Sequence, residues 1–421
     1  DRLNPSELSK ISIHRIAESL HEDLIRIRRH LHAYPELSER EFETTGYLRT
    51  FCDSLVRDSL GRDSLGQAKV RLGNDKRGLW VDLVGDEPSR PIIIRGDIDA
   101  LPIQTAIDAS YRSRRAGVMH ACGHDAHATM ALGAAMILRR VGQTTGLPRG
   151  FAARLILQPA EETSTGALHM IESGALENAQ AAIALHVDPT RPVGELGYRL
   201  GAFTAGCDLY RCAIEGRSGH SARPHLTGDA LNAATTWIHL LHQRVPRCHD
   251  ARDALVVNVG TFHAGEAPNV VPQRVELSGT IRGLSNAALR AADACVEKIN
   301  ASIEASYDVQ VHFERITHTP ALHNDPRVGQ VFVDAARQIV GRDRCRLIDQ
   351  PSMGAEDFSF IAEQVPAAMM RIGVAGDSVG DQALHTPHFD LDESVLPIGA
   401  SVMALAALQY FEGAPYFEAD A

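Results

Sequence analysis

The sequence lacks a long apolar run, an excess of positive charge and a disulfide framework. No uninterrupted apolar stretch reaches 18 residues, so we expect no membrane-spanning helix. The formal net charge of −11 argues against nucleic acid as a partner. The seven cysteines are odd in number and irregularly spaced, which favours reduced thiols. With no signal-peptide pattern at its start, the sequence is expected to belong to a cytoplasmic protein.

Three motifs typical of serine hydrolases and nucleotide-binding proteins are also missing. The chain has no Gly-x-Ser-x-Gly elbow, no P-loop, and no dinucleotide-binding Gly-x-Gly-x-x-Gly after a first strand. These absences argue against serine hydrolases of the α/β type, P-loop nucleotidases and nicotinamide-dependent oxidoreductases. A small-molecule substrate handled by another chemistry is the remaining expectation.

The length of 421 residues and the order of the hydrophobic patterns predict two domains. Residues 12–56 predict two helices, the second starting with a capping box formed by Ser38 and Glu41. Strands at 79–84, 91–94, 153–157 and 181–185 and a helix at 126–141 then predict an α/β sheet whose site lies at the carboxyl ends of its strands. A tandem repeat, Arg57–Gly61 followed by Arg62–Gly66, has no chemistry that we can assign.

The pattern changes near residue 205. Strands at 209–214, 255–262, 274–282 and 309–314, with helices at 229–244 and 286–307, follow the order βαββαβ of a ferredoxin-like unit. We therefore predict a catalytic α/β domain formed by residues 1–204 and 317–421, interrupted by an inserted domain at 205–316. Helices at 328–340 and 394–411 complete the first domain.

The segment Met119–His127 is unusually dense in metal-binding residue types. It contains three histidines, one cysteine and one aspartate in nine residues. On a sharp turn, Cys122 and His124 could place a sulfur at about 2.3 Å and a nitrogen at about 2.1 Å from one ion. Zinc, manganese and cobalt all suit such mixed ligands, and the spacing does not choose among them. The alternative is a histidine-rich loop whose rings cap backbone groups.

Further candidates follow predicted strands. Asp97 and Asp99 point the same way on an extended strand end. The neighbouring acids Glu161 and Glu162 could divide the roles of metal ligand and general base to a metal-activated water. His186 and His385 each end an apolar run, and each taken alone is better explained by a capped or half-buried imidazole than by a metal ligand. His388 competes with His385, and spacing does not decide between them.

The inserted domain offers residues of a different kind. Its segment 216–225 places two histidines and an arginine on a glycine-rich loop, and Asn269 and Arg282 flank a strand. Arginine with an amide suits recognition of a carboxylate. An ordinary surface arginine is the competing interpretation.

The motifs taken together resemble the aminoacylase/carboxypeptidase metallopeptidase family, in its amidohydrolase branch. That branch holds auxin-conjugate hydrolases, hippurate hydrolases and N-acyl-amino-acid amidohydrolases. The similarity runs in order from about His32 to the last helix and is carried by RGDIDALP, GVMHACGHDAH, QPAEE, ALH, GHSARPH, NVVP with TIRG, MGAEDF and LHTPHFD.

The resemblance implies a role for each of these residues. It implies a site for one or two divalent metal ions (manganese or zinc, with cobalt as a further candidate), with Glu161 as general base and Asp99 orienting a ligand. It favours His385 over His388, and gives the ligands as Cys122, His124, Glu162, His186 and His385. It also implies a homodimer formed through the inserted domain, with His220 reaching the partner's site and Asn269 and Arg282 holding a substrate carboxylate.

The function implied is hydrolysis of the amide of an N-acyl or N-aroyl amino acid. Two departures from the family's usual pattern, Thr105 in place of a glutamate and Thr163 in place of a glycine, leave the substrate open. The alternative is hydrolytic deamination of a substituted aromatic amine at the same metal site. A non-catalytic binding protein is a third hypothesis, and the intact set of ligands with Glu161 argues against it.

Overall fold

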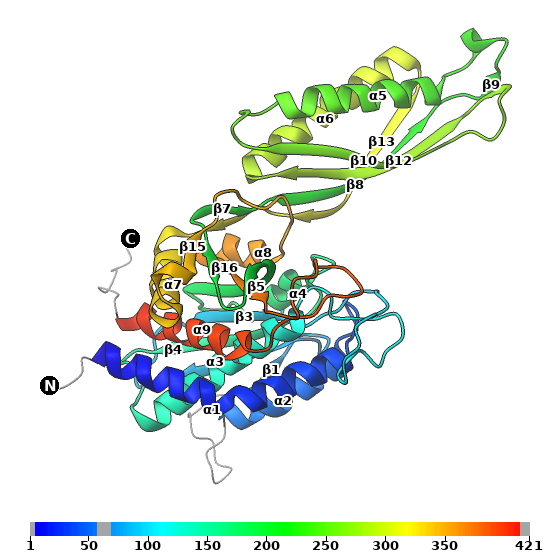
Figure 1. Cartoon of the computed structure of the whole chain (residues 1–421). Coiled ribbons are helices and arrows are strands. Elements are labelled where there is room, and N and C mark those ends of the chain that lie inside the picture. Colours follow the sequence, from blue (N-terminus) through cyan, green and yellow to red (C-terminus); the bar gives the residue numbers. More distant parts are fainter. Residues whose placement is uncertain (1–4, 57–68, 413–421) are drawn as a thin grey trace. The chain divides into compact units, whose positions relative to one another are not determined.

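A computed structural model describes residues 5–56 and 69–412, and the chain forms two compact units (Figure 1). The larger unit comprises Asp1–Gly201, His323–Asp349 and Phe360–Ala421, and the smaller one comprises Ala202–Leu322 and Gln350–Ser359. The predicted insertion at 205–316 falls inside the smaller unit. The tandem repeat at 57–66 lies outside the described residues. Among the described helices, none has the length and apolar character that a membrane crossing requires.

The larger unit is built on a mixed eight-stranded sheet. Its order is β1 (Arg71–Leu72), β2 (Leu79–Val84), β4 (Ala152–Gln158), β3 (Ile92–Asp97), β5 (Ala181–Pro192), β16 (Ala367–Ala375), β6 (Leu196–Tyr198) and β15 (Cys345–Leu347). The four central strands β4, β3, β5 and β16 are parallel. Their side chains are almost entirely buried, as expected for strands covered on both faces. The mixed α/β architecture predicted from the sequence is therefore confirmed.

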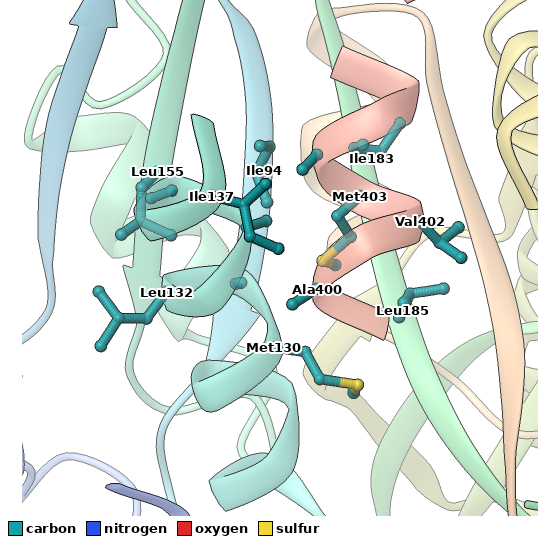
Figure 2. Close-up of a cluster of buried hydrophobic side chains, with 14 of the residues drawn as sticks. Ile94, Met130, Leu132, Ile137, Leu155, Ile183, Leu185, Ala400, Val402 and Met403 are labelled. Atoms are coloured by element: carbon teal, nitrogen blue, oxygen red, sulfur yellow. The ribbon is translucent and has the colours of Figure 1, made fainter. Parts of the chain in front are cut away.

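Helices cover this sheet. The elements α1 (Pro5–Ala33), α3 (His124–Thr144) and α9 (Val395–Glu412) pack against one another, and α7 (Pro326–Val340) contacts α9 and β16. Figure 2 shows side chains of α3 and α9, among them Ile137 and Met403, gathered with Ile94 and Ile183 of the strands. Close approach of the helices depends on Gly133, because a Cβ there would lie 2.9 Å from both Ala400 and Leu24. The larger unit also contains α2 (Phe42–Val56) and α4 (Gly166–Glu172). Each of α8 (Phe358–Gln364), β7 (Gly201–Thr204) and β14 (Leu322–Asn324) includes residues of both units.

The smaller unit contains a four-stranded antiparallel sheet and two helices. The sheet order is β10 (Leu255–Ala264), β12 (Arg274–Gly283), β8 (Gly206–Glu215) and β13 (Gln310–Thr319). Along β12 every second residue is buried, which is the alternation of a sheet with one face on a core. Helices α5 (Ala230–Arg244) and α6 (Asn286–Tyr307) supply that core through residues such as Trp237 and Ile299. The short strands β9 (Gly219–His220) and β11 (Val270–Val271) pair with each other.

The predicted capping box before α2 is wrong. The helix begins at Phe42, and the Ser38 hydroxyl donates a hydrogen bond to Asp99 Oδ2 at 2.7 Å. The Glu41 carboxylate accepts a hydrogen bond from the backbone N–H of Ala160 at 2.7 Å. Both side chains thus serve distant segments of the chain, because partners outside the helix outcompete the local bonds of a cap.

Candidate metal centre and catalytic site

The ligand-rich segment forms a tight turn into α3. Gly123 has a left-handed φ of 84°, and the helix begins at the next residue, His124. A Cβ on Gly123 would lie 2.5 Å from Cγ2 of Val187 in β5, so the turn requires glycine for both its φ and its space. The turn leaves Cys122 and His124 buried on its two sides.

The structure brings together the five residues predicted as ligands. Cys122 Sγ lies 3.7 Å from His186 Nε2 and 3.4 Å from His385 Nε2. Glu162 Oε1 lies 3.5 Å from His385 Nε2 and 3.8 Å from His124 Nε2. Ligand atoms held about 2.1–2.3 Å from one tetrahedral ion lie roughly 3.4–3.7 Å apart. The separations therefore suit metal coordination, and His388 belongs to none of the candidate metal groups among the described residues.

The histidine tautomers leave lone pairs facing the cluster. His186 Nδ1 lies 2.8 Å from the carbonyl oxygen of Val187, and His124 Nδ1 lies 3.0 Å from both Asp99 O and Asp99 Oδ1. Because these oxygens only accept, both Nδ1 atoms must carry hydrogen, and Nε2 is the atom of each ring that can coordinate a metal. Within the described chain, His124 Nε2 and Glu162 Oε1 are buried without a hydrogen-bond partner. An ion would satisfy both atoms.

The local electrostatics also favour a cation. Burial lowers the pKa of His124, but the charge of Asp97 and the contact with Asp99 outweigh burial and raise that pKa well above its ordinary value. Burial raises the pKa of the Cys122 thiol, so the protein alone does not hold it as a thiolate. A divalent ion would supply the positive charge that both groups require. The residues present thus fit a metal site.

Glu161 and Glu162 lie on a constrained loop after β4. Asp99 Oδ2 accepts the backbone N–H of Glu162 at 3.0 Å, while Asp99 Oδ1 contacts the ring of His124. One carboxylate therefore links two predicted ligands, and these bonds lower its pKa although burial opposes them. At the end of the loop, a Cβ on Gly166 would lie 1.6 Å from Pro159 O, so only glycine closes it. Glu161 Oε2 lies 3.8 Å from His124 Nε2.

Sequence reasoning missed a second imidazole–carboxylate pair behind this site. His127 Nδ1 lies 2.7 Å from Asp97 Oδ1, and its Nε2 accepts the backbone N–H of Val187 at 2.9 Å. The Asp97 carboxylate also accepts a hydrogen bond from Arg95 at 2.6 Å. Both residues stood in quoted motifs, yet nothing in their spacing indicated that they pair across the strand and the helix.

The two threonine departures lie in different settings. Thr163 is on the loop of Glu161 and Glu162, where its hydroxyl donates to Ala160 O at 3.3 Å and lies 2.9 Å from the Thr165 hydroxyl. Thr105 is half-buried, and its hydroxyl accepts the backbone N–H of Ile107 at 3.4 Å. Of the two threonines, only Thr163 thus contacts a residue of the loop that carries Glu161 and Glu162, which we call the catalytic loop.

In the smaller unit, the predicted residues lie at opposite ends of a long ribbon. His220 pairs with Val270, next to Asn269, whose carbonyl accepts the N–H of Ser221 at 3.1 Å. Arg282 pairs with Cys207 at the other end of β12 and donates to Met353 O at 2.9 Å. The part of β12 between Arg274 and Arg282 alone spans about 27 Å. The structure therefore brings His220 and Asn269 together but separates both from Arg282 of the same chain.

Comparison with known proteins identifies the family. Residues 93–409 match the model of Peptidase family M20/M25/M40. The chain belongs to this family. It is 33% identical over 379 residues to the N-acetyl-L-cysteine deacetylase of Bacillus subtilis, covering 90% of this chain and 86% of the relative. It is 34% identical over 400 residues to the IAA-amino acid hydrolase ILR1-like 2 of Arabidopsis thaliana, covering 92% of this chain and 85% of the relative.

A solved structure extends the comparison. The M20/M25/M40 chain resembles the Bacillus subtilis YXEP protein, a dinuclear metal-binding peptidase of family M20, with a TM-score of 0.77 and 29% identity. The match covers 94% of this chain and 99% of that structure. These findings confirm the family predicted from the motifs and the prediction of a metal-dependent hydrolase acting on C–N bonds.

Proposed function

We propose that the protein hydrolyses the amide bond of a small N-acyl or N-aroyl amino acid and releases the free amino acid. The convergence of Cys122, His124, Glu162, His186 and His385 beside Glu161 carries this proposal. The substrate class is supported by its relatives in Bacillus subtilis and Arabidopsis thaliana, an N-acetyl-L-cysteine deacetylase and an IAA-amino acid hydrolase. The substrate class and the identity of the metal, manganese or zinc, are both part of the proposal.

The catalytic roles follow from the positions of the side chains. One or two divalent ions held by the five ligands would polarise the substrate carbonyl and make a water molecule more acidic. Glu161 then accepts the proton of the attacking water and returns it to the leaving nitrogen. Asp99 keeps His124 in the tautomer that faces the ion and holds the backbone of Glu162.

We further propose that the site is completed by a second copy of the chain. In this proposal the smaller unit acts as a ferredoxin-like dimerisation domain, and His220 of one subunit stabilises the oxyanion in the other's site. The distance between Asn269 and Arg282 within one chain supports this arrangement, because a single small carboxylate cannot reach both. Two copies, each supplying a different end of the ribbon, would bring the amide and the guanidinium to one carboxylate.

The substrate class is tested by product analysis. Protein loaded with manganese or zinc is offered a panel of N-acyl amino acids and substituted anilines, and mass spectrometry identifies the nitrogen-containing product. Free amino acid from the wild type, with a loss of about 10²–10⁴-fold in kcat for Glu161→Gln, is the expected result. The variant should bind metal like the wild type. Ammonia with a hydroxylated ring would support deamination and contradict the amide proposal.

The shared site is tested by mixing two inactive variants. Glu161→Gln retains His220, and His220→Ala retains Glu161, so a mixed dimer regains one complete site out of two. If subunits exchange at random, an equal mixture should recover about one quarter of the wild-type activity. A mixture that stays as inactive as its components, although mass spectrometry shows mixed dimers, would contradict the shared site.

A further inference from the structure

Glu41 is a buried carboxylate that neither the motifs nor the metal site accounts for. It directly precedes α2, is fully buried, and its side chain reaches across to the loop after β4. Its Oε1 accepts the backbone N–H of Ala160 at 2.7 Å and that of Glu39 at 3.1 Å. The bond to Ala160 joins positions 119 residues apart in the sequence. The Glu41 carboxylate therefore links the turn before α2 to the loop after β4.

Ala160 is the residue on which the catalytic loop closes. Its carbonyl accepts the N–H of Gly166 at 3.0 Å and the hydroxyl of Thr163 at 3.3 Å. Its φ of 52° lies in the left-handed region, which is strained for an alanine because its Cβ crowds the backbone there. Glu161, the proposed base, is the next residue. Whatever holds Ala160 in this conformation therefore sets the direction in which Glu161 leaves the sheet.

The two halves of the loop are held by different acids. Asp99 accepts the N–H of Glu162, and Ser38 donates to the same Asp99 oxygen. Glu41 accepts the N–H of Ala160 on the other side of Glu161. A weaker contact, from the Thr165 hydroxyl to Glu39 Oε1 at 3.3 Å, ties the end of the loop to the same turn before α2. Glu161 thus lies between two backbone N–H groups, those of Ala160 and Glu162, and side chains outside the loop accept a hydrogen bond from each of them.

We infer that Glu41 is a positioning residue for Glu161, because it holds Ala160 in the left-handed conformation that directs the base toward the metal ligands. The inference rests on the proposed function for the role of Glu161, but the contact between Glu41 and Ala160 stands without it. Glu41 acts through the backbone of Ala160.

Two substitutions separate the hydrogen bond from the charge. Glu41→Gln keeps an oxygen that can accept the N–H of Ala160, whereas Glu41→Ala removes the acceptor. We expect Glu41→Ala to lower kcat by about 10–100-fold, a range typical of groups that orient catalytic ligands, while KM and metal content per subunit stay close to wild type. Glu41→Gln should restore most of kcat. If Glu41→Ala does not fold, Glu41→Asp, shorter by one methylene, should lower kcat in the same direction.

A second readout does not depend on activity. Hydrogen exchange of a peptide covering residues 155–166 reports on the buried N–H of Ala160. Exchange in Glu41→Ala should be at least about tenfold faster than in wild type, and Glu41→Gln should exchange at nearly the wild-type rate. The measurement is made on the full-length protein loaded with metal.

Glu36 provides the matched control. It is nearly as buried as Glu41 and lies in the same turn, but its Oε2 accepts the N–H of Thr44 in α2 at 2.7 Å. Glu36→Ala should leave kcat and the exchange of residues 155–166 unchanged. Equal losses of kcat in Glu36→Ala and Glu41→Ala, or unchanged exchange at Ala160 in Glu41→Ala, would overturn the inference. A wild type inactive on every N-acyl amino acid would instead reject the proposed function, and the exchange data would still decide the contact.

Discussion

Replacing Arg28 by methionine should destabilise the larger unit more than any single surface change. The guanidinium is completely buried and donates to Asp125 Oδ2 at 2.8 Å, to Asp390 Oδ1 at 2.7 Å and to Glu393 Oε1 at 3.2 Å. These three acids come from the start of α3, from the loop after His385 and from the residues before α9. Arg28 therefore joins α1 to two of the segments that carry predicted metal ligands, those of His124 and His385.

The size of the effect follows from the charges left behind. Asp125 is fully buried and Asp390 nearly so, and removing the only fully buried cation of this described network leaves both short of compensation. Breaking a buried ion pair in this way costs about 3–5 kcal/mol of unfolding free energy. If Asp125 is changed to asparagine as well, its uncompensated charge disappears, and we expect the double variant to recover about 1–3 kcal/mol of that loss.

The loss should also depend on pH. Burial tends to raise the pKa of Asp125, but Arg28 and His32 together lower it well below its ordinary value. In the wild type, Asp125 therefore contributes stability that is present above its unfolded pKa of about 4 and is lost only as the pH falls toward the folded value. Without Arg28, burial raises that pKa, and stability is lost as the pH rises. The deficit of Arg28→Met should be larger at pH 8 than at pH 5.5.

The two tryptophans make the assay specific to one unit. Trp80 lies in β2 of the larger unit and Trp237 in α5 of the smaller one. In a Trp237→Phe background, urea unfolding followed by fluorescence reports only on the larger unit, and a chelator removes any contribution from bound metal. A deficit below about 1 kcal/mol at both pH values would refute the argument that Arg28 compensates buried charge.

Three further predictions follow. The pKa values of Cys122 and His124 are both raised, so metal binding at pH 7.5 should release about two protons. Calorimetry in buffers of different ionisation enthalpy measures this release. A metal affinity that does not rise with pH would contradict the prediction. Gly133→Ala should cost about 1–3 kcal/mol in urea unfolding, since the new methyl lies against Ala400 and Leu24, whereas Gly46→Ala in α2, with open space around it, should stabilise the fold by up to about 1 kcal/mol. Burial, with the charge of Asp99, raises the pKa of Glu41 to about 7, so the stability linked to its protonation is present below the unfolded pKa and is lost as the pH rises through 7. Glu41→Gln should therefore gain stability relative to wild type between pH 5.5 and pH 8, and parallel pH profiles of the two proteins would count against this prediction.

Elements with a strong hydrophobic pattern were predictable from the sequence. The strand at 79–84 and the helix at 286–307 have the predicted limits, because a short apolar run and a long amphipathic repeat are each distinctive. Strand β16 was missed, although it pairs with β5 in the centre of the sheet. It opens with Ala367, Ala368, Met369 and Met370, residues that favour helices over strands. Burial between covering helices, which no local pattern reports, makes this segment a strand.

The candidate site was predictable only in part, for a related reason. The resemblance supplied Cys122, His124, Glu162, His186 and His385, and the structure brings them together. Apart from Asp99, it did not supply the groups that support them. Arg28 donates to Asp125, which is 97 residues away in the sequence, and to Asp390, which is 362 residues away. Pairs so far apart have no characteristic spacing by which the sequence could reveal them. Ser38 and Glu41 even satisfied a local motif that the fold does not use.

The two residues that hold the histidine rings, Asp97 and Asp99, share a chemical reason for being acidic. A carboxylate accepts several hydrogen bonds and, when ionised, donates none, so each partner is forced to be the donor. Asp99 thereby holds the hydrogen of His124 on Nδ1, so Nε2, which faces the other ligands, is the nitrogen that can bind metal once its own proton has left. Asp97 does the same for His127, whose Nε2 is then able to accept the N–H of Val187, the residue that follows His186. An amide in either place could flip and donate, and the ring could then present hydrogen where a lone pair is needed. The acids around the centre therefore determine which nitrogen of each histidine keeps its hydrogen, and so which one can bind metal after the second proton has left.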